Sequence, residues 1–161
     1  MAYTIRAAKP DDAPGIVALI NALARYEGLA HESRPSEARL RSHLAKNASP
    51  RVEALIVRED GSGKCIGFAL YFHNYSTFLT NFGLFLEDLY VAPEFRGRGL
   101  GLALLKELAR IAVKRDCERI DWNVLDWNET AISFYDKLGA KPQSDWVTMR
   151  LEEKQIAELA S

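Results

Sequence analysis

The sequence is poor in the residues that mark secreted, metal-binding or nucleic-acid-binding proteins. It contains two cysteines and three histidines among 161 residues, and its formal net charge is −1. Cys65 and Cys117 form no C-x-x-C pair, and no histidine stands at ligand spacing from another histidine or from a cysteine. We therefore expect reduced structural thiols and no metal site. The nearly balanced charge predicts no nucleic-acid partner.

Long apolar runs, internal repeats and low-complexity segments are also missing. No apolar run approaches the ~20 residues of a membrane-spanning helix. The amino terminus turns polar at residues 9–12, too early for a signal peptide. These absences predict a cytoplasmic protein without a membrane partner. The length suits one domain with a sizeable core, so we expect residues 1–161 to form a single domain.

What the chain does have is a glycine-rich turn after an apolar run. Residues 84–91 are apolar except for Glu87, Asp88 and a tyrosine, and Pro93 stops the run. Three alternating glycines and two arginines follow within residues 96–101, and the apolar residues after them recur at spacings of three and four. The pattern predicts a strand, a turn whose backbone N–H groups surround an anion, and a helix with its positive end at the same place.

Two better-known glycine motifs do not fit. In G-x-G-x-x-G the sixth residue is glycine, but it is Leu102 when counted from Gly97 and Leu104 when counted from Gly99. The Walker pattern fails as well, because residues 61–64 are followed by a cysteine and lack the earlier glycine. Neither motif therefore identifies the anion that binds at this turn.

Periodicity and turn residues predict the order of the elements. The expected elements are a strand over residues 3–8, a helix from Asp11 or Asp12 to Gly28, a helix from Ser36, antiparallel strands over residues 52–58, 65–75 and 83–91, a helix after the glycine turn, a strand over residues 119–125, a helix over residues 128–138 ended by Gly139, and a last strand over residues 146–151. This order predicts an α+β, or mixed α/β, domain around one sheet.

Two segments match one family in the same order. Arg96, Gly99 and Gly101 satisfy the motif Q/R-x-x-G-x-G/A, and residues 128–140 contain N-x-x-A-x-x-F-Y-x-x-x-G. The chain thereby resembles the GNAT superfamily of acetyl-CoA-dependent N-acetyltransferases. The resemblance implies the GNAT fold, a central and mostly antiparallel sheet with a splayed strand pair, flanked by helices.

Three further segments narrow the resemblance. Residues 19–27, 85–91 and 126–129 look like the corresponding segments of spermidine/spermine (diamine) N-acetyltransferases and their thialysine-acetylating relatives. This likeness implies direct transfer of acetyl from acetyl-CoA to a primary amine of a small molecule, without a metal. It also implies a homodimer.

The same resemblance implies the residues that contact acetyl-CoA. They belong to the strand end, the glycine turn and the second motif, and they are Leu89, Tyr90, Val91, Arg96, Gly97, Arg98, Gly99, Leu100, Gly101, Leu102, Asn128, Ala131, Phe134 and Tyr135. The backbone of residues 89–91 would pair with the pantetheine arm as an added strand does. Asn128 also suits the N-cap of its helix.

Two side chains are candidates for the proton transfers. An alkylammonium group with a pKa of ~10.4 must lose a proton before it attacks, and Glu87, in an otherwise apolar strand, is the candidate base. The alternative is a solvated carboxylate on an edge strand. Asp88 would point to the opposite face unless the strand has a bulge. The resemblance implies that Tyr135 protonates the departing sulfur, and the alternative is a tyrosine packed beside Phe134.

The far end of a diamine would need carboxylates and aromatic rings. The candidates for substrate binding are Tyr26, Glu27, Glu87, Asp88, Asp126, Trp127 and Asp145. Two other functions remain open. One keeps the fold and changes the acceptor to a protein lysine or an aminoglycoside, and the other is an acyl-CoA-binding regulatory module without catalysis.

Overall fold

A computed structural model describes residues 2–161. The chain divides after Asn123 into two compact units. The first unit contains the sheet and the glycine turn, and the second contains the carboxyl-terminal motif and the last helix.

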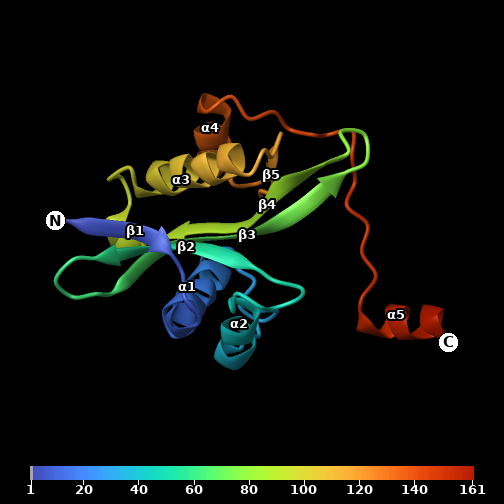
Figure 1. Ribbon diagram of the computed structural model, residues 1–161, viewed down its shortest axis with the longest axis horizontal. Coiled ribbons are helices and arrows are strands. Elements are labelled where there is room, and N and C mark those ends of the chain that lie inside the picture. Colours follow the sequence, from blue (N-terminus) through green and yellow to red (C-terminus); the bar gives the residue numbers. More distant parts are fainter. Residues whose placement is uncertain (1) are drawn as a thin grey trace. The chain divides into compact units, whose positions relative to one another are not determined.

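The first unit is built on a five-stranded sheet in the order β1-β2-β3-β4-β5 (Figure 1). Its strands are β1 (Tyr3–Ala7), β2 (Glu53–Glu59), β3 (Cys65–Ser76), β4 (Asn81–Val91) and β5 (Ile120–Trp122). The first four are antiparallel neighbours, and β5 runs parallel to β4. The predicted mostly antiparallel sheet is confirmed, although β5 is shorter than the expected strand over residues 119–125.

Helices cover both faces of this sheet. A 3-10 turn, η1 (Pro10–Asp12), leads into α1 (Ala13–Tyr26), which is followed by α2 (Glu37–His43), and η2 (Pro93–Phe95) precedes α3 (Leu100–Lys114). In Figure 1, α1 and α2 lie on one face of the sheet and α3 lies on the other. Among the described residues, no helix combines the length and the apolar character needed to cross a bilayer.

Apolar side chains from both helical layers meet the sheet. Ile16 of α1, Phe68 of β3 and Leu104 of α3 have no exposed surface. The apolar faces of these elements therefore form the core. Burial of side chains of this size stabilises a fold by about 1.5–3 kcal/mol each, which explains why the helices stay on the sheet.

The helix ends show which local predictions succeeded. Ser36 caps α2, because its hydroxyl accepts a hydrogen bond from Arg39 N at 3.3 Å. Gly28 follows the end of α1 with φ of 74°, as expected for a left-handed helix terminator. Asp12 stands at the N-cap of α1 without a side-chain cap bond. Its carboxylate instead accepts two hydrogen bonds of 2.8 Å from Arg6.

The second unit contains α4 (Glu129–Lys137) and α5 (Glu153–Ala160). The predicted last strand over residues 146–151 is wrong, since no helix or strand lies between residues 138 and 152. A strand needs a neighbour for its backbone hydrogen bonds, and the second unit has no other strand to provide one. Trp146 and Met149 are accordingly 77% and 87% exposed.

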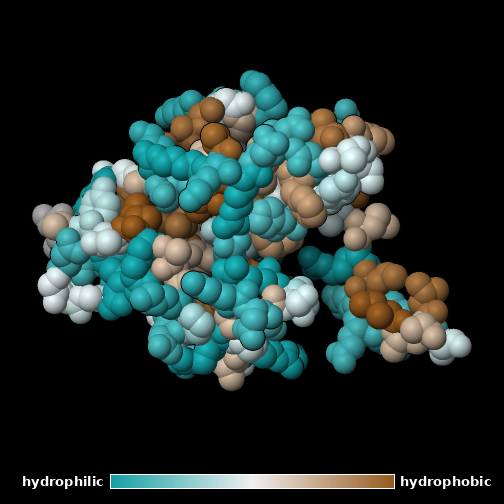
Figure 2. Space-filling model, in the orientation of Figure 1, coloured by the Kyte–Doolittle hydropathy of each residue, from teal (hydrophilic) through white to brown (hydrophobic). Residues whose placement is uncertain are grey.

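The helix α5 was not expected from the sequence. It begins after Glu152, which makes no side-chain cap bond, and its large apolar residues Ile156 and Leu159 are exposed. Figure 2 shows the resulting apolar surface on this terminal helix. Two large apolar residues three positions apart were too weak a periodic pattern for a prediction.

Candidate functional site

The strand β4 contains a bulge at its first carboxylate. Leu70 of β3 pairs with Asp88, whereas Tyr71 pairs with Leu86, so Glu87 has no partner across the ladder. An extra residue of this kind bends a strand and re-aims its side chains. The bulge that would allow Glu87 and Asp88 to serve one site is therefore present.

The edge of β4 opens at the same point. The pairing of β4 with β5 covers Leu84 to Leu86 on β4 and ends at Trp122. Within the first unit, residues 87–91 of β4 thus have a strand on one side only. Because β5 ends at Trp122, backbone groups of residues 87–91 have no strand partner on that side within the first unit, and an extended ligand arm can bind to such groups.

The glycine turn has the backbone conformation that requires glycine. Gly97 and Gly99 have φ of 74° and 76°, and α3 begins directly after them at Leu100. A Cβ added to Gly97, Gly99 or Gly101 would meet no atom within 4 Å. The glycines are thus not needed for packing within the protein, and the turn together with the α3 amino terminus suits an anion such as a pyrophosphate.

The two arginines of the turn contact different parts of the protein. Arg96 Nε donates to the carbonyl of Val91 at 2.9 Å, and its guanidinium carbon lies 4.7 Å from the ring centre of Tyr26 and 5.2 Å from that of Tyr90. Arg98 Nη2 donates to the carbonyl of Glu94 at 3.2 Å. The two guanidinium groups therefore lie against different residues and do not form one binding site together.

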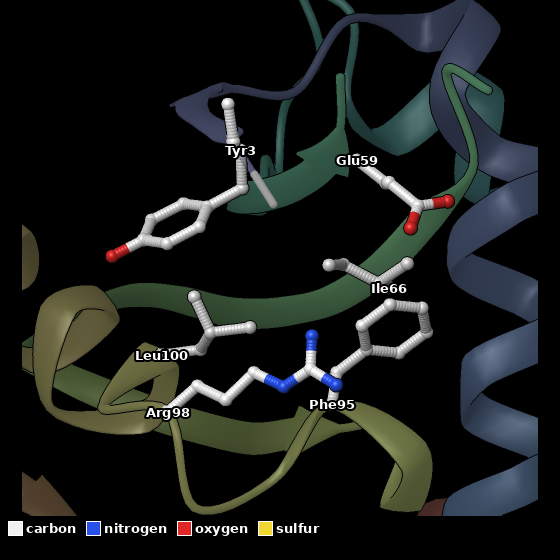
Figure 3. A pocket seen from close by; sticks show the side chains of 7 residues that line it. Tyr3, Glu59, Ile66, Phe95, Arg98 and Leu100 are labelled. Atoms are coloured by element: carbon white, nitrogen blue, oxygen red, sulfur yellow. The ribbon is translucent and has the colours of Figure 1, made fainter. Parts of the chain in front are cut away.

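Arg98 also lines a pocket at the β1 side of the turn. Its guanidinium lies 5.5 Å from the ring centre of Phe95, and both side chains point into a cavity of about 260 Å³ (Figure 3). Tyr3, Glu59, Ile66 and Leu100 line the other sides of this cavity. None of the predicted amine-binding carboxylates belongs to it.

Three carboxylates gather near the bulge. Burial, followed by the negative charges of Glu87 and Glu27, raises the pKa of Asp88 to about 6. Burial also raises the pKa of Glu27, which caps the carboxyl end of α1. The structure thus brings together Tyr26, Glu27, Glu87 and Asp88 of the residues predicted to bind an amine, and their acidic character suits a cation.

Sequence reasoning did not assign a role to the side chain of Tyr90, which lies in this part of the site. Tyr90 was assigned only through its backbone, but its ring contacts Arg96. Asp88 and Tyr90 pair with Leu70 and Phe68, so they share one face of β4. The two-residue spacing from Asp88 was the available signal, because side chains alternate along a strand.

The remaining predicted residues belong to the second unit. Asn128 caps α4, since its Oδ1 accepts a hydrogen bond from Ala131 N at 3.2 Å, which confirms the predicted cap. The rings of Phe134 and Tyr135 lie 5.3 Å apart, and burial raises the pKa of Tyr135. Asp126, Trp127 and Asp145 are exposed. The catalytic and binding roles expected of these residues stay predictions.

No metal centre accompanies this arrangement in the described part of the chain. Residues 2–161 contain no group of three or more His, Cys, Asp or Glu side chains that could hold a metal ion. The groups present for chemistry are the carboxylates, the tyrosines and the glycine turn. A bulged strand with one open edge that leads into a glycine turn and a helix defines an acyltransferase-like class of site.

Comparisons with known proteins identify the family within this class. A model of the acetyltransferase (GNAT) family matches residues 16–140. Thialysine N-epsilon-acetyltransferase of Sus scrofa is 35% identical over 165 aligned residues, which cover 97% of this chain and 96% of that protein. Spermidine/spermine N(1)-acetyltransferase-like protein 1 of Homo sapiens is 31% identical over 98% of this chain and 24% of its own length.

A solved structure shares the fold. An integron cassette protein from the mobile metagenome of V. cholerae superimposes with a TM-score of 0.80 at 28% identity, over 99% of this chain and 98% of that one. The chain therefore belongs to the GNAT family of acetyltransferases. It is an N-acetyltransferase that acts on amines.

Proposed function

We propose that this enzyme transfers acetyl from acetyl-CoA directly to a primary amine of a small molecule, namely a diamine, a polyamine or a lysine-like amine such as thialysine. The observation that carries the proposal is a cluster of three carboxylates near the bulge, those of Glu27, Glu87 and Asp88, beside the open edge of β4. The names of the relatives support the same substrate class.

The backbone around the glycine turn fits acetyl-CoA. Residues 97–102 would hold the pyrophosphate through backbone N–H groups, because the space around the missing Cβ atoms is open and the amino terminus of α3 is positive. Leu89, Tyr90 and Val91 would pair with the pantetheine arm along the edge that β5 leaves open. Asn128, Ala131 and Phe134 are the proposed contacts from the second unit.

Glu87 is the proposed base. When bound, acetyl-CoA supplies an acetyl thioester whose carbonyl carbon accepts the amine. At neutral pH an amine with a pKa of ~10.4 is mostly protonated, a handicap of roughly 4–5 kcal/mol. Glu87, exposed and re-aimed by the bulge, takes this proton directly or through water. Asp88 and Glu27 hold the remaining positive charge of the substrate, and Tyr26 lines that region.

Tyr135 is the proposed acid. The C–N bond forms as the C–S bond breaks, and the nitrogen then loses its second proton to solvent, from which Tyr135 recovers the proton that it donates. The sulfur leaves more readily as a thiol than as a thiolate. Since burial raises the pKa of Tyr135, its hydroxyl keeps its proton at neutral pH and can donate it to the sulfur. Asp126, Trp127 and Asp145 are proposed as further contacts to the amine.

The proposal extends to the state and location of the protein. We propose a homodimer in the cytoplasm, as the resemblance implies. The exposed apolar residues of the second unit, such as Trp146 and Met149, support association with another chain. Sedimentation at micromolar concentration should give twice the chain mass of 18.1 kDa, and a monomer would contradict the dimer.

A direct assay tests the activity. Release of CoA should be followed with thialysine, L-lysine, diamines, polyamines, aminoglycosides and a lysine-containing peptide. We expect turnover with the small diamines or lysine-like amines. Turnover of the peptide or of aminoglycosides alone would change the acceptor, and turnover of none, with retained acetyl-CoA binding, would favour a non-catalytic module.

A further inference from the structure

Arg96 lies where the glycine turn meets the carboxylate group. Its guanidinium contacts the rings of Tyr26 and Tyr90 at 4.7 and 5.2 Å. Its Nε is held by the carbonyl of Val91 at 2.9 Å. A cation fixed against two rings by a backbone hydrogen bond is pre-organised, so it loses little freedom on binding a ligand.

Each of the two rings belongs to a residue that is close to an acidic residue in the chain. Tyr26 directly precedes Glu27, and Tyr90 follows Asp88 by two residues on the same face of β4. Two strand residues span about 7 Å. The ring that contacts the Arg96 guanidinium thus lies on the same face of β4 as Asp88, one step along the strand.

The charge of Arg96 has no ion-pair partner among the described residues. None of the ion pairs within residues 2–161 includes it. Glu94 has a longer-range electrostatic interaction with Arg96, but the Glu94 carboxylate forms its ion pair with Lys64 Nζ at 3.4 Å. The guanidinium therefore retains donors for an anionic group of a ligand.

Neighbouring charges of both signs select between two kinds of amine. A diamine or polyamine brings only positive charge, and Arg96 repels it. A diamino acid brings an ammonium group and a carboxylate on the same carbon, and these complement the acidic residues and Arg96 respectively.

We propose that Arg96 is a specificity-determining residue which selects diamino monocarboxylic acids over diamines that lack the carboxylate. The inference rests on the proposed function of the same site. The side chain of Arg96 binds the amine substrate, whereas the backbone of the glycine turn binds the pyrophosphate of acetyl-CoA.

Pairs of substrates that differ only in the α-carboxylate measure how much this group contributes to recognition. L-lysine and 1,5-diaminopentane differ only in that group, as do L-ornithine and 1,4-diaminobutane. The ratio of kcat/KM within each pair should be measured for the wild type, Arg96→Gln, Arg96→Lys and Arg98→Gln. Glutamine keeps a donor for the Val91 carbonyl without the charge, and Arg98 is a matched control because it contacts Glu94 and Phe95 instead.

The expected result is a change in preference that only Arg96 controls. Arg96→Gln should lower the amino-acid-to-diamine ratio about tenfold, Arg96→Lys should retain part of the preference, and Arg98→Gln should leave the ratio within about twofold. An unchanged ratio in Arg96→Gln would overturn the inference. So would a rise confined to KM for acetyl-CoA, because it would assign the side chain to the cofactor.

A binding measurement separates this inference from the proposed function. Calorimetric titration of the intact protein with L-lysine and with 1,5-diaminopentane requires no turnover. If neither amine is acetylated, the proposed function fails, and tighter binding of L-lysine that is lost in Arg96→Gln still supports the role of Arg96. Equal binding of the two ligands to the wild type contradicts it.

Discussion

Asp88 on β4 and Glu27 at the end of α1 lie close enough for their negative charges to repel each other. Burial is the first cause of the high pKa of Asp88, and the charges of Glu87 and Glu27 add to it, so that the pKa reaches about 6. An ordinary aspartate titrates near pH 3.9. Asp88 therefore changes its charge in a range where enzymes are readily assayed.

Replacing Asp88 by asparagine should reveal this titration. We expect Asp88→Asn to lower kcat/KM for a diamino substrate about tenfold at pH 7.5, because a charged partner of the ammonium group is lost. The ratio of variant to wild type should rise toward one below pH 6, where protonated Asp88 is neutral as well. A ratio independent of pH would remove Asp88 from substrate binding.

Stability provides the control for Asp88. Because its folded pKa is raised, the folded state binds more protons than the unfolded chain between about pH 4 and pH 6, so Asp88 lowers stability as the pH rises through this window. Asp88→Asn should therefore be at least as stable as the wild type at pH 7 in urea unfolding. A marked loss of stability would make its kinetics uninformative and would contradict the predicted sign of the effect.

Glu87→Gln should lower kcat about 100-fold or more at pH 7.5, since loss of a general base has this order of effect. The deficit should shrink toward pH 10, where solvent deprotonates the amine. Glu107→Gln is the control, because Glu107 lies on α3 and pairs with Arg110 at 2.7 Å. A deficit that stays constant with pH would indicate a positioning role for Glu87.

Gly99→Ala and Gly101→Ala should differ although a Cβ at either position meets no protein atom within 4 Å. Gly99 has φ of 76°, which costs alanine about 1–2 kcal/mol, so we expect KM for acetyl-CoA to rise about tenfold. Gly101 lies within α3, where alanine is the better helix former. Gly101→Ala should keep its stability and bind acetyl-CoA within about threefold of the wild type, and equal losses in both variants would contradict the backbone role of the turn.

Tyr135→Phe should lower kcat about 10- to 100-fold with little change in either KM, because it removes the proton donated to sulfur. Tyr75→Phe is the control, since Tyr75 on β3 is 51% exposed. If Tyr135 is only a packing residue beside Phe134, the variant will instead show a lower melting temperature and undiminished turnover.

Tyr71 should make the protein sensitive to alkali. Burial, followed by the charge of Glu53, raises the pKa of Tyr71 to about 12. The unfolded chain loses this proton near pH 10 and the folded chain does not, so stability falls as the pH rises from about 10 to 12. At pH 11 the loss is about 1.4 kcal/mol. Urea unfolding at pH 9 and pH 11 should show this loss in the wild type but not in Tyr71→Phe.

Local sequence signals predicted the parts of the fold that depend on neighbouring residues. Ser36 and Asn128 cap their helices, and Gly28 and Gly139 follow helices with positive φ, as expected. Asp12 is the exception. Its carboxylate binds Arg6 instead of capping α1, because strand β1 brings a guanidinium to it, and a charged partner competes with the backbone N–H.

The carboxyl-terminal residues escaped prediction for a related reason. Residues 146–151 have the composition of a strand, but a strand forms only where a partner satisfies its backbone groups. No strand of the second unit provides that partner. The helix α5 has two large apolar residues, both exposed, and no side-chain cap bond, so its local pattern was weak.

The sequence by itself determined the family and the chemical inventory, because the glycine turn and the segment from Asn128 to Tyr135 are contiguous motifs whose spacing carries their meaning. It also indicated that Glu87 and Asp88 needed a bulge to act together. Only the tertiary structure decided that Glu87 is the unpaired residue, that Glu27 reaches Asp88, and that Arg96 contacts the rings of Tyr26 and Tyr90. These relationships join residues far apart in the chain, and they depend on which elements pack against each other, which no single segment specifies.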